Sequence, residues 1–376
     1  RSYVGEGKRG EELESMWYKK YGDFLLLAGI VLVSSLPLGA PNIPFLFYDR
    51  FIIVVCNLFT CFACDWTFRK VFDDRQVGVF CAALYTLSIY RLYLTYGKMD
   101  MGATVCMAIL PLEIYAVHGI LMEEKRKKRW AFCALLSISV IGALQAHIII
   151  GAISAVALMA VFIFFWRKII RRDVLIDVLC SAAIVVLCNM QCIWRCIQEV
   201  KLELGLFPQA NGRMIQSKGL YFAQLFFSFF ERGSHHDYAE NGLMDVEAIG
   251  IGMALMLPLY IFLFLCIAYR KTEEKSTLMP VGRTASVLGG VSLLLSLSVF
   301  PWTRLQSFHR YLYIIISMLQ SPEYFLAIAT IALTAVAGVV LLWIRTMRCR
   351  EAYICYISSI MLLAGMGAVF YLSSLI

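Results

Sequence analysis

Long runs of apolar residues alternate with short polar segments along almost the whole chain. Most runs approach the roughly 17–25 residues with which an α-helix crosses a bilayer. The pattern predicts about eleven membrane-spanning helices, of which the third is short and favours a tilted or re-entrant segment. The predicted spans are residues 23–40, 51–68, 77–92, 102–122, 130–147, 150–166, 174–194, 248–269, 284–300, 323–344 and 353–375.

The polar segments between these runs predict how the chain is oriented. If the N-terminus lies inside, every inner segment carries several Lys or Arg residues, as the positive-inside rule requires. We therefore expect a cytoplasmic N-terminus and an outer C-terminus. The inner segments are residues 1–22, 69–76, 123–129, 167–173, 270–283 and 345–350.

The remaining organisation follows from this topology. Residues 1–22 predict a cytoplasmic interfacial segment, and residues 23–376 predict a single all-α, polytopic transmembrane domain. Its two long outer loops are expected at 195–247 and 301–322. We expect the phenylalanines at 226–230 to form an interfacial helix in the first loop. The second loop holds an apolar piece too short to span, which favours an interfacial or re-entrant position.

Composition agrees with a membrane protein and excludes other classes. Apolar residues make up 60% of the 376 positions and charged residues 16%. A soluble surface needs more charge than that. The net charge of +8 lies in clusters beside apolar runs, so it predicts orientation signals and no nucleic-acid partner. Most of the 13 cysteines fall inside the runs, where packing explains them better than zinc or redox chemistry.

Glu113 is the clearest ionisable residue inside a predicted span. Charge at membrane depth is costly, by roughly 2.5–3.5 kcal/mol, so such a residue is a candidate for function. Pro111 removes a backbone donor just before it and predicts a kink that opens a polar pocket. The alternative is a structural ion pair with Arg91 or Lys98.

A second group of candidates lies at or just beyond the outer end of the third span. Arg91, Lys98 and Asp100 occur among tyrosines, a combination that suits a phosphate group at headgroup level. Ordinary interfacial anchoring explains the same pattern. His147 falls at the tight outer turn between spans five and six, where it either faces the same cavity or caps a helix.

Metal and nucleotide chemistry have weaker signals. His235, His236 and Asp237 are metal-ligand types in an exposed loop, but adjacent residues rarely face one ion. The metal is therefore unknown, with a divalent ion as one possibility. No Walker, Rossmann, GxSxG or HExxH pattern occurs.

The same segments contain a set of short motifs: Tyr90-Arg91, Tyr96-Gly97-Lys98, Gly102-Ala103, Ile109-Leu110-Pro111-Leu112, Gln145-Ala146-His147 and Gln320-Ser321-Pro322-Glu323-Tyr324-Phe325. Through these motifs the chain resembles a family, the bacterial YfhO-like multi-pass membrane proteins, including the branch related to 6-pyruvoyl-tetrahydropterin synthase. These proteins are similar to GT-C glycosyltransferases. The resemblance covers most of the chain from about residue 40 to 345.

The resemblance implies a GT-C-like fold in the bacterial plasma membrane, with sugar transfer from a polyprenyl-phosphate donor on the outer face. In such enzymes a carboxylate in the first outer loop is the base or a metal ligand. Here that loop contains one acid, Asp49. Ala103 replaces a second family acid, and Asp100 is its nearest substitute.

Three functions remain open from the sequence. In the first, a glycosyltransferase uses Asp49 and Asp100 in catalysis, while Arg91, Lys98, Glu113 and His147 bind the donor. In the second, a non-catalytic relative keeps the cavity and handles a lipid or polymer among the membrane lipids. In the third, a secondary transporter uses Glu113 as its proton site.

Overall fold

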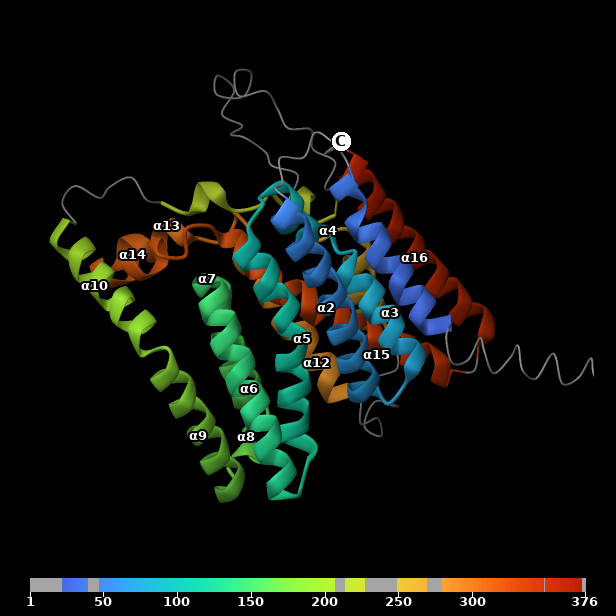
Figure 1. The fold of residues 1–376 in the computed structure, drawn as a ribbon, viewed down its shortest axis with the longest axis horizontal. Helices are drawn as coiled ribbons and strands as arrows, with labels where there is room; N and C mark the ends of the chain where they lie inside the picture. Colours follow the sequence, from blue (N-terminus) through green and yellow to red (C-terminus); the bar gives the residue numbers. More distant parts are fainter. Residues whose placement is uncertain are drawn as a thin grey trace, which may run out of the picture.

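The computed structural model describes residues 22–39, 47–206, 214–226, 249–268, 279–347 and 349–373 (Figure 1). The predictions for residues 1–21, for Phe227, Phe229 and Phe230, and for the His235–Asp237 stretch fall outside these ranges. Residues 22–35 form the first helix. The other long helices are α2 (Phe47–Phe72), α3 (Arg75–Thr86), α5 (Met101–Met122), α6 (Arg126–Ala146), α7 (Ile148–Phe164), α9 (Arg172–Cys188), α10 (Met190–Leu206), α11 (Met253–Ala268), α12 (Met279–Ser296), α15 (Phe325–Thr346) and α16 (Arg350–Ser373).

Shorter helical pieces connect the long ones. They are η1 (Leu36–Gly39), α4 (Ile89–Leu92), η2 (Tyr93–Gly97), α8 (Trp166–Ile169), η4 (Gln216–Lys218), η5 (Phe222–Leu225), α13 (Trp302–Phe308), α14 (Arg310–Ser317) and η7 (Pro322–Tyr324). The described part of the chain contains no β-strand, only an isolated bridge between Leu220 and Leu297. The all-α prediction is therefore confirmed there.

Several helices are long and apolar enough to cross a membrane. Five such helices occur in the described ranges, or up to seven if each of two bent pairs is one span. One pair, Arg75–Thr86 with Ile89–Gly97, bends by 47° and coincides with the short third predicted span. Three apolar helices of 10–17 residues coincide with other predicted spans. The lengths thus show a multi-pass helical membrane protein but do not confirm the count of eleven.

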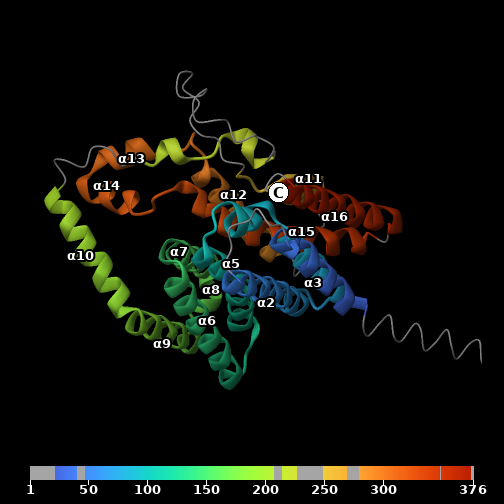
Figure 2. The same cartoon turned by 45° about the horizontal axis from the view of Figure 1, so that its top comes forward.

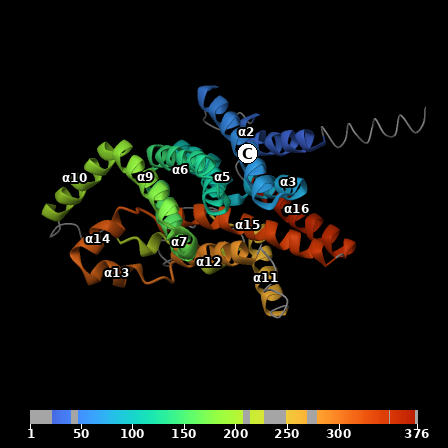
Figure 3. The same cartoon turned by 90° about the horizontal axis from the view of Figure 1, so that it is seen from below.

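Helix α15 forms the centre of the bundle. It contacts α12 and α11 on one side and α3 and α2 on the other (Figures 2 and 3). Its sequence is rich in Ala and Val, and 89% of its most apolar stretch is buried. Small side chains let membrane helices approach closely. At Gly289 of α12, an added Cβ would lie 3.1 Å from Leu333 of α15.

Ion pairs gather the basic segments at one end of the bundle. Arg69 at the end of α2 pairs with Asp65 at 2.8 Å and with Asp23 at 3.3 Å. Arg345 at the end of α15 pairs with Asp74, the residue that caps α3. Helices α13, α14 and the end of α16 lie at the opposite end (Figure 1). The separation follows the predicted charge asymmetry, and the compartment on each side stays a prediction.

Helices α9 and α10 form an arm that diverges from the rest of the bundle. At its basic end, Arg129 Nε of α6 donates to Asp177 Oδ2 of α9 at 2.8 Å, and both side chains are buried. The arm bends by 66° at Asn189. Beyond the bend, α10 contacts α14, and the arm stands apart from α7 in Figure 1.

Candidate functional site

Three of the predicted site residues meet at the end of the bundle opposite the basic segments. Lys98 and Asp100 come from the loop between η2 and α5, and His147 comes from the turn between α6 and α7. Glu323 and Tyr324 of η7 join them, although sequence reasoning did not select these two as site residues. We call these five residues the polar cluster.

The Lys98 ammonium is the positive centre of the polar cluster. It forms an ion pair with Glu323, donates to the Tyr324 hydroxyl at 2.8 Å and lies 4.2 Å from the Tyr324 ring centroid. Burial opposes its charge, but the Glu323 carboxylate and the Tyr324 hydroxyl outweigh that effect and raise the pKa of Lys98. Lys98 is thus a charged group that already has a counter-ion.

Asp100 and His147 form the second half of the polar cluster. His147 Nδ1 accepts a hydrogen bond from the Ile150 amide at 3.2 Å, which leaves the ring proton on Nε2. Nε2 lies 3.4 Å from Asp100 Oδ2. The hydrogen bond from His147 and one from the Ala103 amide lower the pKa of Asp100, although burial opposes them. A carboxylate with a lowered pKa is a weak general base.

The backbone is strained on both sides of the polar cluster. Three non-glycine residues in the described ranges have positive φ, and two of them are Met99 (54°) and Gln320 (59°). Met99 separates Lys98 from Asp100, and Gln320 precedes η7. Left-handed conformations cost L-residues roughly 1–2 kcal/mol and persist where the surrounding structure imposes them.

Arg91 lies in a separate network inside the bundle. Its side chain has no exposed surface, and its guanidinium donates to Thr86 O at 3.1 Å and to Thr60 Oγ1 at 3.2 Å. The guanidinium nitrogen that donates to Thr60 also donates to the side-chain oxygen of Asn57. This arrangement joins α4 to α2 and gives the expected phosphate-binding role no geometric support.

Glu113 and Asp49 are also apart from the polar cluster. Glu113 is 3% exposed, and Ser154 Oγ of α7 donates to it at 3.4 Å. Thr67 Oγ1 donates to Pro111 O at 3.0 Å and so occupies an acceptor beside the proline. Asp49 is half-buried in the first turn of α2 and has no ion pair with another described residue.

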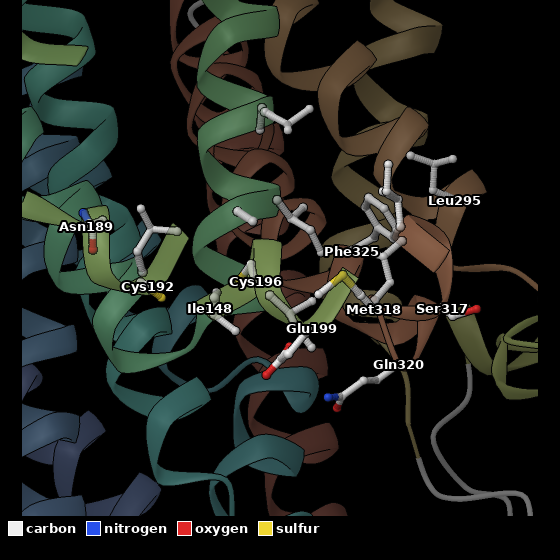
Figure 4. A pocket seen from close by; sticks show the side chains of 18 of the residues that line it. Ile148, Asn189, Cys192, Cys196, Glu199, Leu295, Ser317, Met318, Gln320 and Phe325 are labelled. Carbon is white, nitrogen blue, oxygen red and sulfur yellow. The ribbon is translucent and has the colours of Figure 1, made fainter. Parts of the chain in front are cut away.

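A large cavity lies beside the polar cluster, between α7 and α10. Its volume is about 1370 Å³, above the roughly 300–1,000 Å³ of typical small-molecule pockets. Its lining is mostly apolar, and aliphatic side chains of α7, α12 and α14 form a large part of it (Figure 4). Gln145 and Ile148 flank the His147 turn, and Gln320 precedes η7, so the cavity and the polar cluster share two segments of backbone. A second cavity of about 500 Å³ shares Ile148 and Ala152 with it.

Sequence reasoning missed two kinds of residue here. Glu323 stands at the start of an apolar span, so the rule that selected Glu113 applies to it equally. Arg195 and Glu199 of α10 line the cavity, but the bend at Asn189 is needed to bring them there. In the described part of the chain, no three His, Cys, Asp or Glu residues gather to hold a metal ion.

These features define an all-helical, multi-pass membrane protein with a polar cluster beside an apolar cavity. No family model matches the chain, and no curated protein or solved structure matches it either.

Proposed function

We propose that this protein binds a lipid whose hydrocarbon chain occupies the cavity between α7 and α10. The cavity itself carries the proposal, because it is large, mostly apolar and bordered by helices of a membrane bundle. The arm formed by α9 and α10 contacts α6 at one end and α14 at the other, so the cavity lies between the arm and the rest of the bundle. We expect it to open to the lipids of the membrane. Because the bilayer core is as apolar as the cavity, we expect packing inside the cavity and polar contacts at its end to stabilise the bound chain.

We expect the polar cluster to determine at which end of the cavity the lipid headgroup lies. It lies beside the cavity, at the end of the bundle where α13 and α14 are found (Figure 1). The ligand class that we propose is a membrane phospholipid. The resemblance to YfhO-like proteins instead favours a polyprenyl-phosphate sugar in the bacterial plasma membrane, which belongs to the second candidate function below. Because Glu323 already neutralises Lys98, the polar cluster is better suited to positioning a lipid than to attracting an anion.

A variant whose larger side chain fills the cavity tests the proposal. Ala152 lines both cavities, and Ala152→Phe places a ring in the shared wall. Met159→Phe is the matched control, because Met159 is exposed on α7 but lines neither cavity. The probe is a photoactivatable long-chain phospholipid in nanodiscs, with cross-linked peptides identified by mass spectrometry.

We expect cross-links on α7 and α10 in the native chain and in Met159→Phe, and a several-fold loss in Ala152→Phe. Cross-links spread evenly over the lipid-facing helices, unchanged by Ala152→Phe, would refute lipid binding in the cavity.

A second candidate is sugar transfer from a polyprenyl-phosphate donor. The observation that favours it is the accessible Asp100 carboxylate, 23% exposed, beside His147 at the cavity end. With its lowered pKa, Asp100 suits a metal ligand better than a base. Release of polyprenyl phosphate from a sugar-loaded donor, abolished by Asp100→Asn or Asp49→Asn, would establish this activity. Lipid binding without release in the presence of Mg²⁺ or Mn²⁺ would leave the binding function alone.

A further inference from the structure

Two oppositely charged side chains of α10 line the cavity, Arg195 and Glu199. They are four residues apart and so lie one turn from each other on the same helical face. Both are exposed, and neither forms an ion pair or hydrogen bond with another described residue. Glu199 lies at the lower edge of the lining side chains in Figure 4.

The two side chains do not neutralise each other. A pair four residues apart on a helix is stabilised less when the cation precedes the anion, as Arg195 precedes Glu199. Their charged atoms lie beyond 4.0 Å of one another, the limit for an ion pair. The cavity wall therefore presents one separate positive group and one separate negative group.

Neutral amides complete this end of the cavity. Gln145 from the last turn of α6 and Gln320 before η7 also line it, and Gln320 is labelled together with Glu199 in Figure 4. Each amide supplies both donors and an acceptor. Gln320 has a positive φ of 59°, so its side chain is held here against a conformational cost.

We propose that this wall binds a zwitterionic headgroup with a primary amine, of the phosphatidylethanolamine type. The phosphate contacts Arg195, and the ammonium donates to Glu199 and to the Gln320 amide oxygen. This inference rests on the proposed lipid-binding function and specifies its headgroup. An anionic headgroup leaves Glu199 without a cation, and a choline headgroup has no N–H to donate.

The test compares three lipids that differ only in headgroup. The full chain is reconstituted in nanodiscs, and native mass spectrometry measures retention of phosphatidylethanolamine, phosphatidylcholine and phosphatidylglycerol with identical acyl chains. We expect the native chain to prefer phosphatidylethanolamine about tenfold over either competitor. A factor of ten corresponds to about 1.4 kcal/mol, close to one charge-assisted hydrogen bond.

Two variants and two controls assign that preference to α10. Glu199→Gln is expected to bring phosphatidylethanolamine and phosphatidylcholine to parity, and Arg195→Ala to weaken all three lipids. Arg304→Ala on α13 and Glu351→Gln on α16 are matched exposed changes outside the cavity and should change nothing. A preference that survives Glu199→Gln would overturn the inference.

Lipid binding in the cavity and the preference for one headgroup can be refuted separately. Equal retention of the three lipids, still lost in Ala152→Phe, would refute the headgroup assignment and leave the cavity as a chain-binding site. Retention that Ala152→Phe does not reduce would refute lipid binding in the cavity altogether.

Discussion

Asp100 and His147 each cap a different helix and also face each other. Asp100 Oδ1 accepts from the Ala103 amide at 2.8 Å at the start of α5, and His147 Nδ1 accepts from the Ile150 amide at 3.2 Å at the start of α7. The 3.4 Å approach of His147 Nε2 to Asp100 Oδ2 then joins the two helix ends. The two residues thus join the start of α5 to the start of α7, and α7 borders the cavity.

Removal of the Asp100 cap is expected to destabilise the junction between α5 and α7. Asp100→Ala loses the bond to Ala103 and the contact with His147, and we expect a loss of about 1 kcal/mol in unfolding free energy. Asp100→Asn keeps a good capping side chain and should lose less. Thermal unfolding of purified protein in one detergent measures both. Equal losses in the two variants would show that the cap contributes little.

The lowered pKa of Asp100 predicts a loss of stability in acid. A group whose pKa falls on folding stabilises the protein above its unfolded pKa of about 3.9 and loses that contribution as pH falls through the folded pKa. We therefore expect the unfolding temperature to drop between pH 5 and pH 3. Asp100→Asn should show a smaller drop over the same interval, and an identical drop would assign the acid effect to other carboxylates.

The Lys98–Glu323 pair predicts strong coupling between two distant segments. Lys98→Met leaves the Glu323 carboxylate, which is 5% exposed, without its counter-ion. Breaking a buried ion pair in this way typically costs about 3–5 kcal/mol of stability. Because Lys98 is 29% exposed, we expect the lower end of that range. Glu323→Gln should recover part of the loss in the double variant. A double-mutant cycle on unfolding free energy measures the coupling, and strictly additive losses would contradict it.

The class of helical membrane protein could be predicted because the length of the apolar runs matches the thickness of a bilayer and the charge of the loops follows its two sides. The position of Lys98, Asp100 and His147 at one end of the bundle also follows from those runs, since Lys98 and Asp100 fall between predicted spans and His147 ends one at an outer turn. Their contacts with Glu323 and Tyr324 depend on how η7 docks, more than 220 residues along the chain from Lys98. No local pattern carries that information.

The burial of Arg91 could not be predicted either. An arginine at the end of a short apolar run fits the headgroup region. In the structure, Asn57 and Thr60 of α2 supply acceptors that let it remain inside. Likewise, the amphipathic sequence of α10 fits an interfacial helix, and only the 66° bend at Asn189 turns Arg195 and Glu199 into a cavity wall.

Gly102 allows the closest backbone approach near the polar cluster. An added Cβ would lie 2.4 Å from Ala146 O, a backbone atom that cannot rotate away. We expect Gly102→Ala to push the His147 turn from α5 and to lower the unfolding temperature by several degrees. Gly290→Ala in α12 is the control, because nothing lies within 4 Å of its added Cβ. It should be neutral or stabilising by up to about 1 kcal/mol, since alanine favours helix. Equal effects of the two changes would mean that the approach at Gly102 relaxes without strain.

The strain at Gln320 predicts a trade between stability and lipid binding. Gln320→Gly and Met99→Gly both remove a left-handed non-glycine residue, with φ of 59° and 54°, and each should raise unfolding free energy by up to about 1 kcal/mol. Only Gln320 lines the cavity, so only Gln320→Gly should weaken phosphatidylethanolamine retention, by several-fold. Unfolding in detergent and native mass spectrometry in nanodiscs separate the two effects. If Met99→Gly reduced retention as much as Gln320→Gly, the loss would come from the altered backbone, because Met99 carries no side-chain contact to the cavity.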